Sequence, residues 1–214
     1  MSVVTVSAAG AELLAVVDRL AGADGRRIVG IAGAPGAGKS TLAAWLVAHL
    51  GGRATGVPLD GFHLADVELR RRGLLDRKGA PETFDAWGYA ALLARLRARP
   101  DHVVMAPGFE RDLEQPLAGD LPVPPEADVV VTEVNYLILD DPAWDAGRRL
   151  LDEVWFVRTH DPVRRERLVA RHAAFGKSIP AAEAWVTRVD EPNARLVDAS
   201  ASRADLVLDL THWS

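Results

Sequence analysis

The segment that most constrains the fold is Gly33-Ala34-Pro35-Gly36-Ala37-Gly38-Lys39-Ser40, which fits the pattern G-x-x-x-x-G-K-[S/T]. Residues 26–32 before it form an apolar run typical of a buried strand, and residues 41–50 after it are typical of a helix. A strand, a glycine-rich turn and a helix in this order direct backbone N–H groups and a helix N-terminus at an anion. The sequence therefore predicts a phosphate-binding loop and a bound nucleotide, with Thr41 completing the set of contacting residues.

Two residues at the end of this loop have predicted roles of their own. Lys39 is expected to reach the β- and γ-phosphates of the nucleotide, and the hydroxyl of Ser40 is expected to ligate Mg²⁺. The predicted cofactors are thus ATP and Mg²⁺.

The 214 residues fit one domain with a small lid at about residues 161–180. A net charge of −5 argues against a broad nucleic-acid or membrane surface, and the absence of cysteine excludes disulfides and thiolate metal sites. No apolar run has the length of a membrane span, and no secretory signal is apparent at the N-terminus. We expect a cytoplasmic protein with no nucleic-acid or membrane partner.

Segments typical of strands alternate with segments typical of helices. This alternation predicts a parallel, doubly wound sheet with helices on both faces, a three-layer α/β sandwich. In the helix expected at residues 9–21, Leu13, Leu14, Val17 and Leu20 should share the inward face. Strands are expected at 26–32, 54–60, 102–106, 128–133, 153–158 and 204–210, and further helices at 86–99 (with Tyr89, Leu92, Leu93 and Leu96 inward), 142–151 and 181–189; 61–84 and 107–125 lack a clear period.

Two carboxylates end predicted strands of the sheet. Asp60 ends the second strand and Glu133 ends the strand at 128–133. Ligands of open parallel sheets bind beyond the carboxyl ends of the strands, so both carboxylates should approach the phosphate loop. Phosphoryl transfer needs a group that holds Mg²⁺ and a base for the acceptor hydroxyl, and these two residues suit those tasks. The alternative is that both carboxylates cap neighbouring loops.

A basic helix is expected to open at Asp161-Pro162, with Asp161 as N-cap. Arg164, Arg167 and Arg171 recur at three- and four-residue spacing and therefore share one face. Such a row is either a solvated surface or a lid that supplies positive charge to the transferred group.

Two further side chains are candidates for substrate binding. His63 lies in a polar segment just after Asp60, which favours a substrate-facing position over a core position. Arg77, beside Lys78, either binds substrate or is solvated.

Taken in order, these motifs resemble the phosphoribulokinase/uridine kinase family of P-loop kinases, and within it the bacterial nucleoside kinase-like, pantothenate kinase-like and fructose-transport-system kinases. The resemblance extends from Arg27 to Leu210. Besides the phosphate loop, it rests on Pro58–His63, Arg77–Asp85, Pro107–Arg111, Thr132–Leu137, Arg164–Ser178 and Glu191–Arg195.

The resemblance implies a role for each matching residue. Asp60 matches the catalytic base, Glu133 the acidic residue near Mg²⁺ and substrate, and Arg167 and Arg171 the lid arginines. The segment with Phe109 and Arg111 matches the acceptor pocket. Asn135 and Tyr136 lie in a motif next to the substrate, and Asn193 and Arg195 fall where the chain passes the adenine. Family members are often dimers or tetramers, so a homodimer is one assembly that the resemblance allows.

One position departs from the family pattern, because Val134 stands where this branch usually has glycine. A β-branched residue is stiff and disfavours positive φ. The expected function is that of an ATP-dependent kinase that phosphorylates a hydroxyl of a small metabolite such as a nucleoside, a sugar or a pantothenate-like compound. Val134 keeps open an ATPase or a non-catalytic nucleotide sensor. A GTPase is disfavoured, because the chain has no Asn-Lys pair of the guanine-binding motif.

Overall fold

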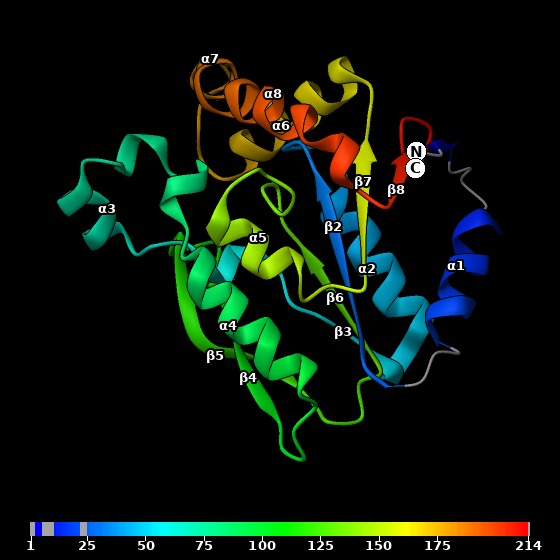
Figure 1. Cartoon of the computed structure of the whole chain (residues 1–214). Coiled ribbons are helices and arrows are strands. Elements are labelled where there is room, and N and C mark those ends of the chain that lie inside the picture. Colours follow the sequence, from blue (N-terminus) through cyan, green and yellow to red (C-terminus); the bar gives the residue numbers. More distant parts are fainter. Residues whose placement is uncertain (1–2, 6–10, 22–24, 214) are drawn as a thin grey trace.

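The computed structural model describes residues 3–5, 11–21 and 25–213. Six parallel strands form one sheet in the order β1-β8-β7-β2-β6-β3, with β2 near its centre (Figure 1). The predicted parallel, doubly wound sheet is confirmed. Its strands are β1 (Val3–Thr5), β2 (Arg27–Gly33), β3 (Ala54–Gly56), β6 (Val129–Glu133), β7 (Glu153–Arg158) and β8 (Leu206–Asp209).

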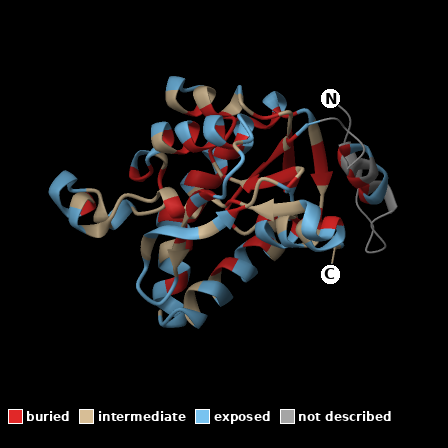
Figure 2. Ribbon diagram, turned by 90° about the horizontal axis from the view of Figure 1, so that it is seen from below, coloured by how far each residue is buried: buried red, intermediate tan, exposed pale blue. Residues whose placement is uncertain are grey.

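Helices cover both faces of this sheet and give the expected three layers. The helices α1 (Ala11–Ala21) and α2 (Lys39–Leu50) contribute to the apolar cluster on one face. The cluster on the other face includes residues of α4 (Ala86–Arg97), α5 (Pro142–Arg148) and α8 (Glu191–Ala199). Buried residues accordingly concentrate in the strands and on the inward sides of the helices (Figure 2).

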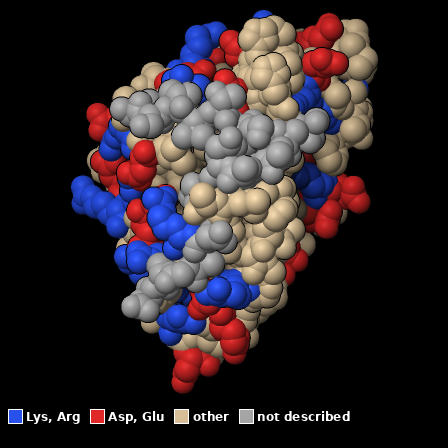
Figure 3. Space-filling model, turned by 90° about the vertical axis from the view of Figure 1, so that its right-hand side faces the viewer, with Lys and Arg blue, Asp and Glu red and all other residues tan. Residues whose placement is uncertain are grey.

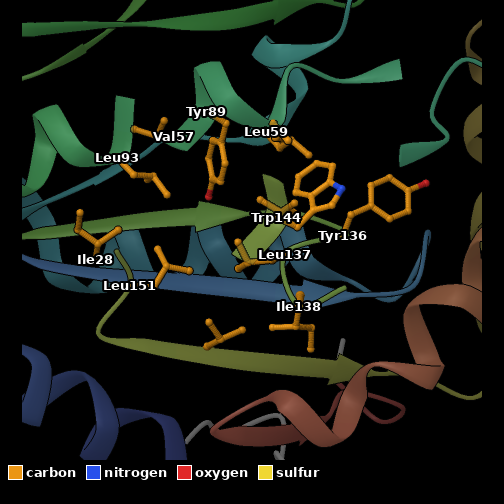
Figure 4. Packing of buried hydrophobic residues seen from close by; sticks show 14 of the residues in the cluster. Ile28, Val57, Leu59, Tyr89, Leu93, Tyr136, Leu137, Ile138, Trp144 and Leu151 are labelled. Carbon is orange, nitrogen blue, oxygen red and sulfur yellow. The ribbon is translucent and has the colours of Figure 1, made fainter. Parts of the chain in front are cut away.

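The packing of α4 follows from its sequence. Tyr89, Leu92, Leu93 and Leu96 all lie inward, as predicted, and are at most 5% exposed. The Asp85 carboxylate caps the helix by accepting a hydrogen bond from the backbone N–H of Gly88, at 2.8 Å. Figure 4 shows the resulting cluster, in which α4 packs with Ile28 of β2 and with side chains from the segments after β3 and β6, from α5 and from just before β7: Val57, Leu59, Tyr136, Leu137, Ile138, Trp144 and Leu151.

The inward face of α1 is narrower than expected. Leu13, Val17 and Leu20 are buried, but Leu14 is 41% exposed, because it lies about 100° around the helix from Leu13. The side of the molecule that carries α1 has basic and acidic side chains mixed with uncharged ones (Figure 3).

One expectation about the sheet is wrong. Residues 102–106 do not join the parallel sheet, and 107–125 is not an irregular connection. Instead β4 (Val104–Glu110) and β5 (Gln115–Val123) form a separate antiparallel ribbon, with a register shift between Ala106 and Gly108. Its prolines hide the alternation that would have revealed a strand, and a two-stranded ribbon tolerates them because each strand has a free edge.

The segment between β3 and α4 folds into short helical turns. The strand β3 ends at Gly56, so Asp60 lies in a 3₁₀ turn (Leu59–Phe62) and not at a strand end. Then follow α3 (Asp66–Arg72) and two 3₁₀ turns, Leu75–Arg77 and Pro81–Thr83; α3 extends away from the body of the molecule (Figure 1).

The last helices lie over the carboxyl ends of the strands (Figure 1). The helix α6 (Asp161–Ala174) has His160 as N-cap, and Asp161 is already helical and bonds to Arg164 instead of capping. After it, α7 (Ile179–Trp185) continues into a π-helical turn, Val186–Asp190, that leads into α8. Short 3₁₀ turns at Gly51–Arg53 and Ala201–Arg203 complete the described helices, none of which is long and apolar enough to cross a membrane.

Candidate active site

The phosphate loop has the backbone that its glycines predict. Gly36 and Gly38 have positive φ angles of 79° and 98°, and a Cβ atom on Gly36 would lie 2.8 Å from the carbonyl oxygen of Arg164. The helix α2 begins at Lys39 with no acidic residue in its first turn, so its N-terminal partial charge is left for an anion. This is the form of a phosphate site.

Lys39 is the buried cation of the loop. Its Nζ donates to the carbonyl oxygen of Ala34 at 3.1 Å, and the residue is 8% exposed. Burial lowers the pKa of Lys39 from 10.5 to about 8, while the charge of Glu133 acts in the opposite direction. A phosphate bound at the loop would place further negative charge beside this buried lysine.

Glu133 lies across from the loop. It ends β6 and is paired in register with Ile31 of β2, the strand that feeds the phosphate loop. Burial raises the pKa of the Glu133 carboxyl, and the charge of Lys39 and a hydrogen bond from the Ser40 hydroxyl oppose that rise. The contact between Ser40 and Glu133 brings the two predicted metal ligands together.

The pairing of Ser40 with Glu133 would suit Mg²⁺ bound together with a nucleotide. In the described part of the chain, no group of three or more His, Asp or Glu side chains is placed to hold a metal. Mg²⁺ commonly takes one or two protein ligands and completes its shell with water and substrate phosphates. Ser40 and Glu133 are such a pair, so they fit an ion that arrives with ATP.

Asp60 occupies the same site from the 3₁₀ turn after β3. Its Oδ2 accepts a hydrogen bond from Nη2 of Arg111 at 2.7 Å. The turn packs tightly on the β4–β5 ribbon, because a Cβ atom on Gly61 would lie 2.3 Å from the carbonyl oxygen of Pro107. The fixed position of Asp60 is therefore set by a glycine beside it and by the ribbon behind it.

A cleft of about 480 Å³, called here the central cleft, joins these groups. Most of the side chains predicted for catalysis and substrate binding line it, from the phosphate loop, the 3₁₀ turn, the ribbon, the end of β6 and the lid: Lys39, Ser40, Asp60, His63, Phe109, Arg111, Glu133, Asn135 and Arg171.

The phosphate loop also borders two smaller depressions. A side groove of about 340 Å³ is lined by Ala34, Ala37 and the residues around the start of α6. An outer groove of about 420 Å³ is lined by loop and α2 residues together with α6 and the segment after β8: Gly36, Gly38, Lys39, Ser40, Thr41, Arg167, Leu168, Arg171, Leu210 and Trp213. Pro35 lines the central cleft, and Gly33, at the end of β2, lines none of the three.

The arginines of α6 do not form one exposed row. Arg167 and Arg171 are exposed and line the grooves beside the loop. Arg164 is 2% exposed, and it bonds to Asp161, to Glu191 and to the carbonyl oxygen of Pro35. Arg164 thus fixes the helix, whereas Arg167 and Arg171 are exposed and could face a ligand.

His63 lines the central cleft but is held by aromatic rings. Its ring centroid lies 4.0 Å from that of Phe84 and 5.2 Å from that of Phe109. Burial lowers the pKa of His63 to about 4, so the ring is neutral at neutral pH. Among the described residues, its buried Nδ1 has no hydrogen-bond partner. Contact with substrate stays a prediction for this residue.

Four other predicted site residues are exposed or make contacts within the protein. Arg77 is exposed, pairs with Glu82 at 2.6 Å and lines none of the three clefts. Tyr136 is buried, and its hydroxyl donates to the carbonyl oxygen of Gly79. Asn193 donates to the same carbonyl at 3.4 Å and lines the central cleft, not the outer groove, and Arg195 is exposed on α8. The roles of all four toward substrate or adenine stay predictions.

Sequence reasoning missed several residues of the central cleft. Asp66, His172, Phe175, Trp185 and Asp190 all line it, and His172 contacts Asp190 at 2.8 Å. The one signal was the basic segment 164–178, which contains His172 and Phe175. Asp190 had none, because it enters the cleft from a π-helical turn.

Val134 adopts an ordinary backbone. Only Arg99 and Glu114 have positive φ among the described non-glycine residues. Val134 is 2% exposed, packs in the core and donates from its backbone N–H to the carbonyl oxygen of Ile31 at 2.9 Å. A glycine is therefore not needed for this conformation.

Known proteins resemble the chain over most of its length, although no protein-family model matches it. It is 31% identical over 194 residues to the "Putative uridine kinase C227.14" of Schizosaccharomyces pombe, covering 86% of this chain and 83% of that protein. It is 33% identical to the "Uncharacterized protein YggC" of Escherichia coli K12, covering 87% and 78%. Among solved structures, the "putative fructose transport system kinase" of Silicibacter sp. TM1040 is 37% identical, with a TM-score of 0.81 and coverage of 91% and 97%.

Proposed function

We propose, from the premise that this chain belongs to the phosphoribulokinase/uridine kinase family of P-loop kinases, that it transfers the γ-phosphoryl group of ATP to an alcohol hydroxyl of a small metabolite. The observation that carries the proposal is the shared cleft. Lys39, Glu133 and Asp60 come from three segments far apart in sequence, and all line the same cavity. That arrangement suits transfer to an acceptor better than nucleotide binding alone.

Each of the main site residues has a role in this proposal. The phosphate loop and Lys39 would hold the β- and γ-phosphates, and Ser40 and Glu133 would hold Mg²⁺, whose charge would offset that of the transferred group. Asp60 accepts the proton of the acceptor hydroxyl. A bond forms between that oxygen and the γ-phosphorus, the bond to the β–γ bridging oxygen breaks, and ADP leaves with the electron pair.

The lid at about residues 161–180 closes over the site in the same proposal. Arg164 keeps the first turn of α6 on the P loop, so closure moves the part of the helix that carries Arg167 and Arg171. Closure would exclude water and bring both guanidinium groups to the phosphates. A homodimer stays a prediction of the family resemblance, and light scattering on the purified chain tests it.

The test is the Asp60→Asn variant, with Asp76→Asn as matched control because Asp76 is exposed in the same segment and lines none of the three clefts. ADP release is measured with and without a panel of nucleosides, sugars and carboxylate-bearing alcohols. We expect Asp60→Asn to lower kcat by about 10²- to 10⁴-fold and to leave ATP affinity nearly unchanged. Undiminished turnover would exclude Asp60 as the base.

The ATPase and the sensor remain the alternatives in this assay. One observation favours them, since Asp60 is already engaged by Arg111. ADP release that is independent of every acceptor would support the ATPase, and ATP binding with no release at all would support the sensor.

A further inference from the structure

Two cations flank one aromatic ring at the acceptor end of the central cleft. Nζ of Lys78 lies 5.5 Å from the ring centroid of Phe109, and Cζ of Arg111 lies 5.5 Å from the same centroid. All three residues line the cleft together with Asp60.

The two cations are held by neighbouring parts of the chain. Arg111 belongs to the turn between β4 and β5, and Nζ of Lys78 donates to the carbonyl oxygen of Glu114 in that turn. Lys78 also pairs with Asp66 at 2.7 Å, and its side chain is only 13% exposed. The turn and Lys78 are therefore joined in one wall of the cleft, where the two cations lie beside the carboxylates of Asp66 and Glu114.

The pairing of Arg111 conflicts with the proposed role of Asp60. Among the described residues, the Asp60 carboxylate is the one hydrogen-bond acceptor that the Arg111 side chain contacts. When Asp60 takes the hydroxyl proton its negative charge is lost, and the charge-assisted bond to Arg111 is lost with it. Arg111 also approaches Oδ2, which is one of the two carboxylate oxygens that could take this proton.

We propose that the acceptor is an alcohol that carries a carboxylate or phosphate group, and that Arg111 and Lys78 bind this group beside Phe109. The inference rests on the proposed function and names its substrate class. The acceptor anion takes the place of Asp60 on the guanidinium, so Arg111 exchanges one anionic partner for another while Asp60 becomes available to the hydroxyl. A neutral alcohol offers only hydroxyl oxygens, which cannot replace the charge of a carboxylate. The planar guanidinium also matches two oxygens of a carboxylate or phosphate.

The test compares acceptors that differ only in this group. The pairs are D-glycerate and glycerol, pantothenate and panthenol, and fructose 6-phosphate and fructose, each assayed by ADP release with Mg²⁺ and ATP. We expect the anionic member of the productive pair to have a kcat/KM at least about tenfold higher. The first two pairs report on a carboxylate and the third on a phosphate.

Variants connect the effect to the two cations. Arg111→Gln and Lys78→Met should each raise KM for the anionic acceptor by roughly 10- to 100-fold, and by much more than they raise KM for its neutral partner. Arg72→Gln is the control, because Arg72 has the same 47% exposed side chain as Arg111 and a 2.6 Å ion pair with Glu68, away from the cleft.

The outcomes separate the two proposals. Equal or better turnover of the neutral members, or an equal loss for both members in Arg111→Gln, overturns the anionic acceptor and leaves the kinase standing. If no acceptor stimulates ADP release, the proposed function falls. Thermal unfolding with a non-hydrolysable ATP analogue then decides the acceptor class separately: an anionic member must raise Tm of the natural chain and not of Arg111→Gln, and the absence of such a shift overturns the inference.

Discussion

Arg164 donates from Nη1 to the carbonyl oxygen of Pro35, 3.2 Å away, and so joins the first turn of α6 to the phosphate loop. The same guanidinium pairs with Asp161 at 3.2 Å and with Glu191 on α8. A buried arginine with three oxygen partners in three segments fixes the relative positions of loop, lid helix and α8. In the proposed lid, Arg164 would be a fixed base, and closure would begin beyond this residue.

Replacing Arg164 should destabilise the protein strongly. Arg164→Met leaves Glu191, whose side chain is 16% exposed, without its closest cation, and breaking a buried ion pair in this way costs about 3–5 kcal/mol in the free energy of unfolding. Urea denaturation measures the loss. The control is Arg165→Met, since Arg165 is 51% exposed and lies 3.6 Å from the same carboxylate, and its loss should stay below about 1 kcal/mol. Similar losses in both variants would contradict the assigned role.

Nucleotide affinity should fall as the pH rises through about 8. The pKa of Lys39 is lowered to about 8 in the free protein, mainly by burial, and the negative phosphates of ATP will raise it. Binding near and above pH 8 must then take up a proton, so affinity is highest below that pH and weakens above it. Calorimetry in buffers of different ionisation enthalpy counts the protons. Lys39→Met should abolish the uptake, and binding enthalpies that do not depend on the buffer would refute the prediction.

Acid should destabilise the protein partly through His63. Its pKa is depressed to about 4 from 6.5, mainly by burial, so the unfolded chain binds this proton at a higher pH than the native state. The contribution of His63 to the free energy of unfolding is constant above pH 6.5. It is lost as the pH falls from there toward 4.

Between pH 7 and 4.5, the natural chain should lose about 2–3 kcal/mol more of its unfolding free energy than His63→Phe does. Urea unfolding at the two pH values measures the difference. His102→Phe removes a histidine that is 68% exposed and should behave as the natural chain does. Equal pH dependence in all three proteins would show that His63 is not the group responsible.

A chain of hydrogen bonds leads from α4 to the segment before Asp60. The hydroxyls of Tyr89 and Thr132 are 2.8 Å apart, and Thr132 donates to the carbonyl oxygen of Val57 at 2.7 Å. Thr132→Val should cost about 1–3 kcal/mol, because it leaves the buried Tyr89 hydroxyl and the Val57 carbonyl without this partner. Tyr89→Phe keeps the second bond and should cost about 0.5–1.5 kcal/mol.

The double variant should cost less than the sum of the two single losses, since the residues share one network. Chemical denaturation gives all three free energies. Additive losses, or a larger loss in Tyr89→Phe, would mean that the two bonds do not act together.

Local patterns predicted much of the fold. The phosphate loop, the inward face of α4 and the bounds of β7 follow from short-range spacing, because a glycine-rich turn, a helical period and an apolar run each leave a signal within a few residues. The ribbon left only part of such a signal, the strand predicted at 102–106, since prolines interrupt the alternation in both of its strands.

The chemistry of the site was predicted at the level of residue type and less well at the level of contacts. Asp60 and Glu133 were placed beside the phosphate loop by the rule for parallel sheets, and both line the central cleft. The contact between Asp60 and Arg111 joins residues 51 positions apart, and the burial of Arg164 depends on a carbonyl 129 positions away. Such contacts depend on how separate segments pack, which spacing along one helix does not determine.

The separate β4–β5 ribbon has a consequence for how such enzymes diversify. The ribbon pairs with itself and not with the six-stranded sheet, yet it supplies Phe109 and Arg111 to the cleft. Mutations, insertions or deletions in its turn can alter the end of the cleft proposed to bind the acceptor, whereas β2, which leads to the phosphate loop, and β6, which ends at Glu133, keep their register. Descendants of one ancestral phosphotransferase can thus acquire new acceptors through changes in this separate ribbon, while they keep the residues that bind phosphate.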